Sequence, residues 1–350
     1  MSRTRTCLGT LVSRLWLIAA VSGLPMAATV AWALPEQEEI TLEIVKDRGW
    51  ENNLRLRNGE VELIVTLDVG PRILSYRRLD GENVLKEYPE QLGQSGEPEW
   101  MIRGGHRLWV SPEDPGRTYA PDNARVAHEV LGPGHVRLTP APDRQYGLQK
   151  EIELKLDTSG TGVEIRHRVR NIGAEPTELA IWALTVLKPG GVEIIPLPPQ
   201  APHPGGPETA TVEKYAPAQS FTTWPYTDFQ DPRWTFGSQA ILLRQDPNRG
   251  PTKLGMLHRT GAVGYLNEGN LFLKRFSYLE GQTYPDFHCN YETFTNEDML
   301  ELETLGPLVK LAPGEMTEHL ERWNLIADLK APEDDSELLD LVLPILLESS

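Results

Sequence analysis

The stretch VELIVTLDV, residues 61–69, carries an aliphatic side chain at every odd-numbered position. In a β-strand, successive side chains point to opposite faces, so these five aliphatic groups share one face. The stretch GVEIRHRVRN, residues 162–171, repeats the pattern, with a charged residue at each even-numbered position from Glu164 to Arg170. Both stretches are typical of strands that bury one face and expose the other.

Short alternating runs of this kind recur along most of the chain, separated by turn signals such as Asp80-Gly81 and Pro313-Gly314. Further runs lie at residues 148–157, 179–187, 191–197, 239–245, 253–259, 271–279, 288–295, 299–305 and 317–326. Many short strands with Gly- and Pro-containing turns indicate an all-β sandwich or barrel. We predict one large antiparallel β-sandwich over residues 38–328, and the absence of a fixed-period repeat argues against a propeller.

Helical periodicity begins only in the tail, residues 329–350. There Asp335-Ser336 can cap a short helix over ELLDLVLPILL, which Pro344 is expected to interrupt. The Pro- and Gly-rich stretch at 196–220 has predicted strands on both sides. We therefore interpret it as a long surface loop within one domain rather than a linker between two.

Residues 1–33 have the order of a secretory signal. Arginines come first, an apolar run begins at Leu15, and Ala31-Trp32-Ala33 supplies small residues at a cleavage position. The apolar run is close to the length of a membrane span, so an uncleaved anchor is the alternative. We expect cleavage, which predicts a periplasmic or secreted bacterial protein with no membrane segment after the signal is removed.

The composition excludes some partners and some kinds of site. The 350 residues contain 34 Lys and Arg against 50 Asp and Glu, a net charge of −16; removing three signal arginines leaves 31 − 50 = −19. So acidic a surface repels phosphate backbones, which argues against nucleic-acid binding. Cys7 lies in the signal and Cys289 is then the single thiol, so no disulfide can form. Metal-binding motifs are lacking, and we predict neither a metal nor another cofactor.

The irregular stretch IRGGHRLWVSPEDPGRTYAPDN, residues 102–123, is the strongest candidate for a ligand site. His106 follows Gly104-Gly105, where the backbone can come close to a ligand, and lies near Arg103 and Trp109. Arginine offers a fork of donors, histidine a switchable donor or acceptor, and tryptophan an apolar plate. The alternative is a turn with Trp109 filling the core.

Three longer stretches together resemble the galactose mutarotase-like superfamily, which has the aldose 1-epimerase fold. They are NGEVELIVTLDVGPRILSYRRLDGENVL (58–85), HRVRNIGAEPTELAIWALT (167–185) and NYETFTNEDMLELETLGPLVKLAPGEMTEHLERWNLI (290–326). More narrowly, GGHRLWVSPE (104–113) resembles a bacterial domain family of unknown function within that superfamily. The resemblance covers most of residues 40–326, and it is more specific for the fold than for an activity.

The resemblance also implies catalytic positions. Epimerases of this family use a glutamate as base and a histidine as acid to open and reclose a sugar ring. Their glutamate falls here on Glu303, in Leu302-Glu303-Thr304, whereas Ile172 stands where the histidine after Asn171 would be. Glu301 shares one strand face with Glu303, as a candidate hydrogen-bond partner. The alternative for this pair is a solvated outer face.

Other candidate ligand-binding residues come from separate stretches. His288 and Glu292 share a face one strand before Glu303, and His288 is a candidate substitute acid. Trp224 begins an aromatic loop, TTWPYTDFQDPRWTF (222–236), that suits stacking on sugar rings or, alternatively, capping the core. His167 and His258 lie on apolar strand faces and are expected in the core.

We predict that several of these residues converge on one concave face. Arg72 follows Gly70-Pro71 at a strand end, from which it can reach the cleft. The expected members of the shared site are His106, Arg72, Arg103, Trp109 and Glu303. The alternative is a salt-bridge cluster that only ties the Gly-Gly loop to the sheet.

Two main functions fit these features. The first is an exported protein that binds a carbohydrate or sugar acid without turnover. The second is an aldose 1-epimerase-like or other sugar-modifying enzyme, with Glu303 as base and a non-standard histidine such as His106 as acid. A third class, a structural or assembly protein, predicts that the GGHRLW residues lie in a core or interface.

Overall fold

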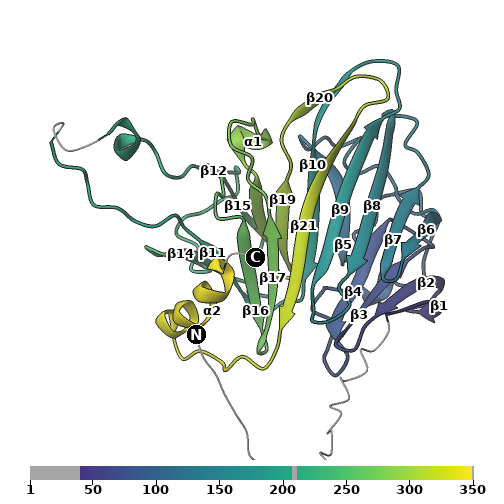
Figure 1. The fold of residues 1–350 in the computed structure, drawn as a ribbon, viewed down its shortest axis with the longest axis horizontal. Helices are drawn as coiled ribbons and strands as arrows, with labels where there is room; N and C mark the ends of the chain where they lie inside the picture. Colours follow the sequence, from purple (N-terminus) through teal and green to yellow (C-terminus); the bar gives the residue numbers. More distant parts are fainter. Residues whose placement is uncertain (1–39, 207–210, 349–350) are drawn as a thin grey trace, which may run out of the picture. The chain divides into compact units, whose positions relative to one another are not determined.

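The computed structural model describes residues 40–206 and 211–348, which form two large antiparallel β-sheets (Figure 1). This confirms the predicted all-β sandwich. The predicted signal, residues 1–33, lies outside the described residues. Within those residues, no helix is long and apolar enough to cross a membrane.

The first sheet has eleven strands, ten of them in one continuous order. That order is β1 (Thr41–Asp47), β2 (Trp50–Arg57), β3 (Val61–Thr66), β4 (Arg72–Arg78), β5 (His106–Ser111), β10 (Thr177–Leu187), β19 (Leu300–Leu305), β18 (Tyr291–Thr295), β15 (Thr252–Met256) and β12 (Phe221–Thr223), with β20 (Val309–Leu311) paired to β10.

The second sheet has ten strands. Its order is β13 (Trp234–Phe236), β14 (Ala240–Arg244), β11 (Val192–Pro196), β16 (Ala262–Asn267), β17 (Asn270–Phe276), β21 (Met316–Ile326), β9 (Val163–Asn171), β8 (Leu148–Leu156), β7 (His135–Pro140) and β6 (Val126–Gly132). The helical segments are η1 (Pro89–Gln91), η2 (Val212–Tyr215), α1 (Pro285–His288) and α2 (Asp335–Leu347).

The main apolar core draws side chains from both sheets. In β9, the odd-numbered residues from Val163 to Asn171 are buried while the residues between them are partly or fully exposed, as the alternation predicts. Their aliphatic groups join Leu108 and Leu302 of the first sheet in one cluster around Trp323. β5 and β19 differ, because both of their faces are buried. Something other than the main core therefore covers their second face.

Helix α2 covers part of the outer face of the second sheet. Its apolar side chains Leu338, Val342, Leu343 and Leu346 form a separate cluster with residues of β11, β14, β16 and β17. The prediction for this segment was wrong in two details. The side chain of Asp334, rather than Asp335-Ser336, caps the helix, and the helix continues through Pro344. Pro344 lies in the last turn, where it removes a single backbone hydrogen bond, and the buried apolar face outweighs that loss.

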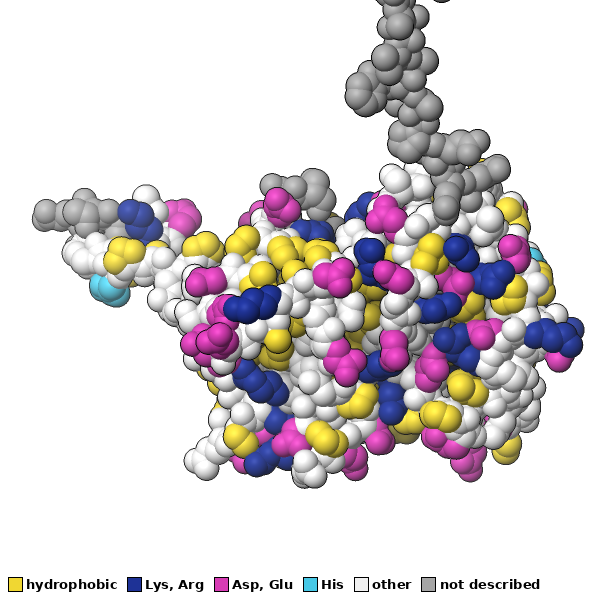
Figure 2. Space-filling view, turned by 90° about the horizontal axis from the view of Figure 1, so that it is seen from below, with side chains coloured by type: hydrophobic (Ala, Val, Ile, Leu, Met, Phe, Trp, Pro, Cys, Tyr) yellow, Lys and Arg dark blue, Asp and Glu magenta, His cyan; other side chains and the backbone are white. Residues whose placement is uncertain are grey.

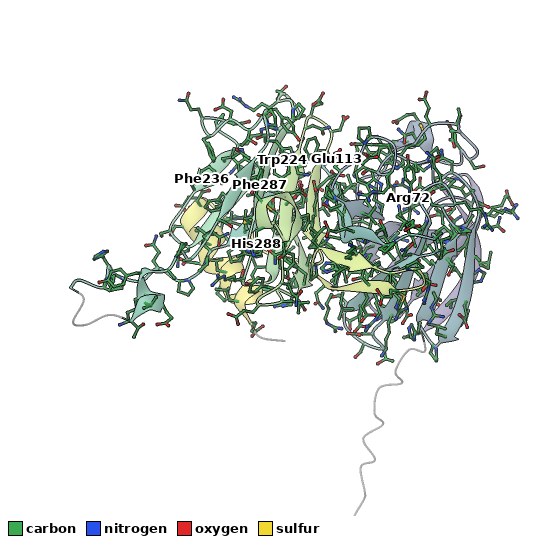
Figure 3. All side chains as sticks on the ribbon, turned by 90° about the horizontal axis from the view of Figure 1, so that it is seen from above. Arg72, Glu113, Trp224, Phe236, Phe287 and His288 are labelled. Atoms are coloured by element: carbon green, nitrogen blue, oxygen red, sulfur yellow. The ribbon has the colours of Figure 1, made fainter. Side chains whose placement is uncertain are left out.

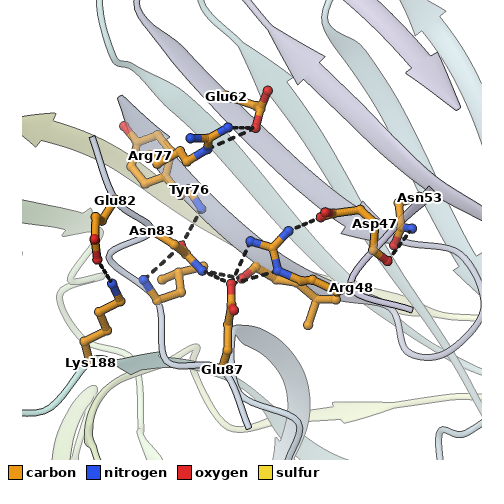
Figure 4. Close-up of polar contacts among 12 residues, drawn as sticks. Asp47, Arg48, Asn53, Glu62, Tyr76, Arg77, Glu82, Asn83, Glu87 and Lys188 are labelled. Carbon is orange, nitrogen blue, oxygen red and sulfur yellow. Dashed lines mark hydrogen bonds and ion pairs between the residues drawn. The ribbon is translucent and has the colours of Figure 1, made fainter. Parts of the chain in front are cut away.

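Gly104 and Gly105 allow the backbone to approach another part of the protein, not a ligand. A Cβ at Gly104 would lie 2.0 Å from the carbonyl oxygen of Lys86, and one at Gly105 would lie 2.2 Å from that of Ile73. The Lys86 segment is itself anchored, since Glu87 Oε1 accepts hydrogen bonds from Asn83 Nδ2 at 2.7 Å and from Arg48 Nε at 2.7 Å (Figure 4). The expectation that the backbone of Gly104-Gly105 comes close to a ligand was therefore wrong.

The surface carries charges of both signs. Figure 2 shows acidic and basic side chains interspersed over one face of the molecule. The long Pro- and Gly-rich loop predicted at 196–220 lies between β11 and β12, and its residues 199–206 and 211–220 are mostly exposed.

Candidate functional site

Three neighbouring strands of the first sheet, β5, β10 and β19, build the candidate site. Leu184 of β10 pairs with Arg107 of β5 on one side and with Glu303 of β19 on the other. Residues paired across antiparallel strands point to the same face, so these three side chains form one row. The row faces away from the main core, because the alternate residues Leu108 and Leu302 lie in that core.

A cavity of about 260 Å³ opens on this face of the sheet. Most of its residues are of two kinds, aromatic side chains and charged side chains that are mostly buried; Ile102, Leu184, Asn296 and Met299 complete the lining. The aromatic residues are Trp100, Trp109, Tyr119, Trp182, Tyr226 and Phe294, and the charged residues are Arg107, Glu113, Lys253, Glu301 and Glu303. The cavity therefore combines apolar plates with buried hydrogen-bonding groups, as small-molecule sites commonly do.

Trp109 is the centre of the aromatic cluster. Its ring centroid lies 5.0 Å from that of Trp100, 5.1 Å from that of Tyr119 and 5.4 Å from that of Trp182. The contacts with Tyr119 and Trp182 are edge-to-face, an arrangement that aromatic pairs favour. Because each ring is held by its neighbours, the walls of the cavity are pre-organised.

Glu303 is buried and held by two donors. Its Oε2 accepts hydrogen bonds from Trp182 Nε1 at 2.9 Å and from Lys253 Nζ at 3.0 Å. Burial raises the pKa of Glu303, although the neighbouring ammonium of Lys253 acts in the opposite direction. The alternative of a solvated outer face for Glu301 and Glu303 was wrong, since both side chains are buried.

Lys253 joins Glu303 to a second carboxyl group, that of Glu292. The Lys253 Nζ atom lies 2.7 Å from Glu292 Oε2, and it also lies 4.8 Å from the ring centroid of Trp182 and 4.6 Å from that of Trp224. Burial by itself would lower the pKa of Lys253, but the two carboxylates outweigh burial and raise it. Burial raises the pKa of Glu292 to about 8. Lys253 thus places one ammonium group between two buried carboxyl groups, those of Glu303 and Glu292.

Arg107 and Glu301 form a second buried pair in the cavity. Arg107 Nη1 lies 2.9 Å from Glu301 Oε1, and the guanidinium carbon lies 4.2 Å from the ring centroid of Trp109. The two charges attract, but they are not aligned for a hydrogen bond. Among the described residues, Arg107 Nε and Nη1, Glu301 Oε1 and Trp100 Nε1 are buried without a hydrogen-bond partner. Such groups favour a bound molecule that supplies the missing partners.

His106 does not belong to this cavity. It lies on the core face of β5, where Nδ1 is 2.9 Å from Thr185 Oγ1 and the ring centroid is 4.9 Å from that of Trp323. Adjacent residues of a strand point to opposite faces, so Arg107, and not His106, faces Glu303. The predicted convergence of His106 with Glu303 was therefore wrong. The strand begins at His106 itself, which the sequence had suggested was part of the loop.

Arg72 and Arg103 do not line the cavity but bind the segment that forms part of its wall. Arg72 donates to the backbone oxygens of Met101 at 3.0 Å and Ile102 at 2.9 Å, and Arg103 donates to Glu97 Oε2 at 2.6 Å. Both arginines are fully buried. They correspond to the predicted alternative, a cluster of polar contacts that ties the loop to the sheet, and they hold in place the segment that carries Trp100.

The remaining predicted residues fall into two groups. Trp109, Glu301 and Glu303 lie together in the cavity, with Glu292 and Trp224 next to them through Lys253. His288 belongs to α1, where its Nδ1 accepts a hydrogen bond from the backbone N–H of Tyr284 at 3.3 Å. His288 is not among the residues that line the cavity, whereas Glu303 is, and in the view of Figure 3 His288 lies apart from Trp224. The structure therefore does not bring His288 to Glu303.

Sequence reasoning did not select Trp100, Trp182 or Lys253 as site residues. Trp182 lies on a strand in which almost every residue is apolar, so its role depends on the register that pairs it with Trp109. Lys253 is an isolated charge in the short strand β15, and nothing in its neighbourhood in the sequence points to Glu303. Arg107 could have been predicted from the sequence, because it is next to His106 and two residues before Trp109, both of which were selected.

A second polar cluster lies in the main core, on the opposite face of the sheet. His106, His167 and Glu321 place nitrogen and oxygen atoms within 4.8 Å of one another, and transition metals accept such donors. However, the Nε2 atoms of His106 and His167 lie at a hydrogen-bonding distance of 2.7 Å, and Lys274 Nζ lies 2.9 Å from Glu321 Oε1. His167 Nδ1 is 3.2 Å from the backbone oxygen of His319, so His167 carries its proton there and accepts through Nε2. The cluster is thus a closed hydrogen-bond network.

Comparison with solved structures identifies the fold. A galactose mutarotase-like protein from Lactobacillus casei is 10% identical and has a TM-score of 0.53, with 79% of this chain and 100% of that one covered. A protein from Klebsiella pneumoniae, provisionally named an aldose 1-epimerase, is 10% identical with a TM-score of 0.52, covering 89% of this chain and 88% of that one. A TPR-domain-containing protein from Parabacteroides distasonis is 14% identical with a TM-score of 0.52, covering 85% of this chain and 56% of that one.

Comparisons with protein-family models and with curated proteins found no match. The structural similarity agrees with the two antiparallel sheets and with the resemblance of the three sequence stretches. At these low identities it shows the fold and not the activity. The chain has the galactose mutarotase-like fold.

Proposed function

We propose that this chain binds a carbohydrate in the cavity of β5, β10 and β19, without converting it chemically. The observation that carries the proposal is the pairing of aromatic walls with buried polar groups that have no hydrogen-bond partner in the protein. Trp100 Nε1 and two nitrogens of Arg107 are such donors. A sugar ring offers apolar C–H faces to the aromatic plates and hydroxyl oxygens to the donors.

The absence of a histidine from the cavity lining favours binding over turnover. Opening a sugar ring requires one group that removes a proton and another that donates one. All eight histidines of the chain lie in the described ranges, and none lines the cavity. Moreover, Glu303 Oε2 is already engaged by Trp182 and Lys253. These contacts suit a carboxylate that orients a ligand.

One observation favours a second candidate, a sugar-modifying enzyme of the aldose 1-epimerase type. Glu303 and Glu292 flank Lys253, and burial raises the pKa of both carboxyl groups. Neighbouring titratable groups with shifted pKa values can act as an acid–base pair. In this candidate Glu303 is the base, and the protonated Glu292 supplies a proton through Lys253.

Calorimetric titration with glucose, galactose, mannose and glucuronate tests the binding. We expect saturable binding of at least one of these sugars, and an affinity at least about tenfold lower in Trp109→Ala, equivalent to about 1.4 kcal/mol. Trp234→Ala is a matched control, because Trp234 is 7% exposed against 6% for Trp109 but lies in the other sheet. No binding to any of the four sugars, or equal losses in both variants, would contradict the proposal.

Polarimetry separates the two candidates. We expect the wild-type protein to leave the rate of anomer exchange of a bound sugar at its value in buffer. An acceleration that disappears in Glu303→Gln would instead establish the enzyme. Export remains part of the proposal on the strength of residues 1–33 alone, and a mass that includes those residues in protein recovered from outside the cytoplasm would contradict cleavage.

A further inference from the structure

The short segment α1, Pro285–His288, is a strained turn with an exposed aromatic side chain. Three consecutive non-glycine residues have positive φ angles, 49° at Asp286, 58° at Phe287 and 82° at His288. Such conformations are strained for non-glycine residues and persist only where the surrounding structure imposes them. Phe287 is nevertheless 91% exposed, the largest value among the exposed large hydrophobic residues.

The contacts of Asp286 impose this conformation. Its Oδ2 accepts a hydrogen bond from Ser111 Oγ at 3.0 Å, and its backbone oxygen accepts from Thr222 Oγ1 at 3.2 Å and Cys289 Sγ at 3.0 Å. Strands β5 and β12 therefore hold the turn from two sides. Strain that is stabilised in this way, with a phenyl ring left in solvent, indicates a use for the ring.

The same contacts place Phe287 at the rim of the cavity. Ser111 ends β5 and is followed two residues later by Glu113, which lines the cavity; Thr222 precedes Trp224, which packs on Lys253. Cys289, two residues after Phe287, lies with Trp224 against Gly255 of β15, because a Cβ built on Gly255 would be 2.7 Å from Cys289 Sγ and 3.1 Å from Trp224 Cη2. Figure 3 labels Phe287 and Trp224 in the same part of its view. The turn that carries the exposed ring thus lies beside residues of the cavity wall.

The size of the cavity limits how much of a glycan it can enclose. Its volume of about 260 Å³ is below the range of roughly 300–1,000 Å³ for sites that enclose drug-sized ligands. It suits one sugar ring, so a second linked ring must lie outside, at the rim. We propose that Phe287 is a stacking platform for this second sugar unit and that the natural ligand class is a disaccharide or longer glycan. This inference rests on the proposed carbohydrate binding in the cavity.

The test compares each monosaccharide with its disaccharides by titration calorimetry, using glucose with maltose and cellobiose, and galactose with lactose. We expect the wild-type protein to bind one disaccharide at least about fivefold more tightly than its monosaccharide, which equals about 1 kcal/mol. In Phe287→Ala this ratio falls towards one, and in Phe287→Trp it is retained. Phe236→Ala is the control, because Phe236 is an exposed phenylalanine of β13 in the other sheet and should leave the ratio unchanged.

Phe287→Gly shows whether loss of binding reflects loss of structure. Glycine adopts a φ of 58° without strain, so this variant should keep or raise the melting temperature while losing the disaccharide preference. A wild-type protein that binds monosaccharides and disaccharides equally, or a preference that survives Phe287→Ala, would overturn the rim platform while leaving sugar binding intact. If none of these sugars binds, both the platform and the proposed function are wrong.

Discussion

Among the described residues, Lys253 carries the only ammonium group that lines the cavity, and it contacts both Glu303 and Glu292. It also lies over the faces of Trp182 and Trp224. Removing one partner of a buried ion pair leaves the other charge uncompensated, which costs much more than the pair itself contributes. A single side chain therefore sets the charge state of this part of the site.

We expect Lys253→Met to lower the free energy of unfolding by about 3 kcal/mol at pH 7. The loss should be smaller at pH 5, because Glu303 and Glu292 already have raised pKa values and can take up protons when the cation is gone. Urea denaturation at the two pH values measures both effects. Lys330→Met, which removes an exposed pair with Glu337, is the control and should change little. Equal losses at both pH values would show that packing, and not charge, is responsible.

The segment from Met101 to Gly105 connects the wall of the cavity to the sheet. Arg72 and Arg103 hold it through hydrogen bonds, and Gly104 brings its backbone against that of Lys86. Any side chain at Gly104 must displace this contact. The positions of Trp100 and of β5 therefore depend on an element that has no regular secondary structure.

Gly104→Ala should destabilise the protein by more than about 3 kcal/mol and weaken sugar binding, since it combines backbone strain at a φ of 81° with a clash against Lys86. Gly96→Ala is a closely matched control, because Gly96 has a φ of 80° but no atom within 4 Å of a built Cβ. The difference between the two variants in urea denaturation isolates the clash. Equal destabilisation would mean that the approach to Lys86 is not important.

Across the whole molecule, buried titratable groups should make stability depend on pH in both directions. Burial lowers the pKa of four histidines. The pKa values of His106 and His167 lie below the ordinary value, that of His258 is lowered to about 4, and that of His319 to about 3. Their unfolded pKa is about 6.5, so the unfolded state binds more protons below that value. Their contribution to stability is present above about pH 6.5 and is lost as the pH falls.

Three buried carboxyl groups act in the opposite direction. Burial raises the pKa of Glu193 and of Glu292 to about 8, and it also raises that of Glu303. Their contribution is present below the unfolded pKa of about 4.3 and is lost as the pH rises towards 8. The four histidines outweigh the three carboxyl groups only once about three-quarters of the unfolded-state histidines are protonated, so we expect maximal stability near pH 6.

Urea denaturation between pH 4 and pH 9 measures this profile. His258 is the best single test, because it contacts neither the cluster around Glu321 nor the cavity, and burial alone accounts for its lowered pKa. His258→Gln should reduce the slope on the acid side by about 1.4 kcal/mol per pH unit, the value for one proton. A profile without a fall below pH 6 would contradict the burial of neutral histidines.

The sequence by itself determined the class of fold, because period-two alternation specifies which side chains share a face of a strand. It also indicated that Glu301 and Glu303 lie on one face of a strand, and that Trp109 and the stretch 102–123 belong to a ligand site. Alternation is a local property, however, and it does not tell which strand lies beside which, or what covers the second face.

Only the tertiary structure decided the membership of the site. The register of β10 between β5 and β19 brings Arg107 to Glu303 and sends His106 to the opposite face, into a network with His167. Lys253 of β15 contacts Glu303 of β19, although the two residues are fifty positions apart in the sequence. Side chains from distant segments meet because non-local strand pairing brings them together, and no pattern along the chain records that pairing.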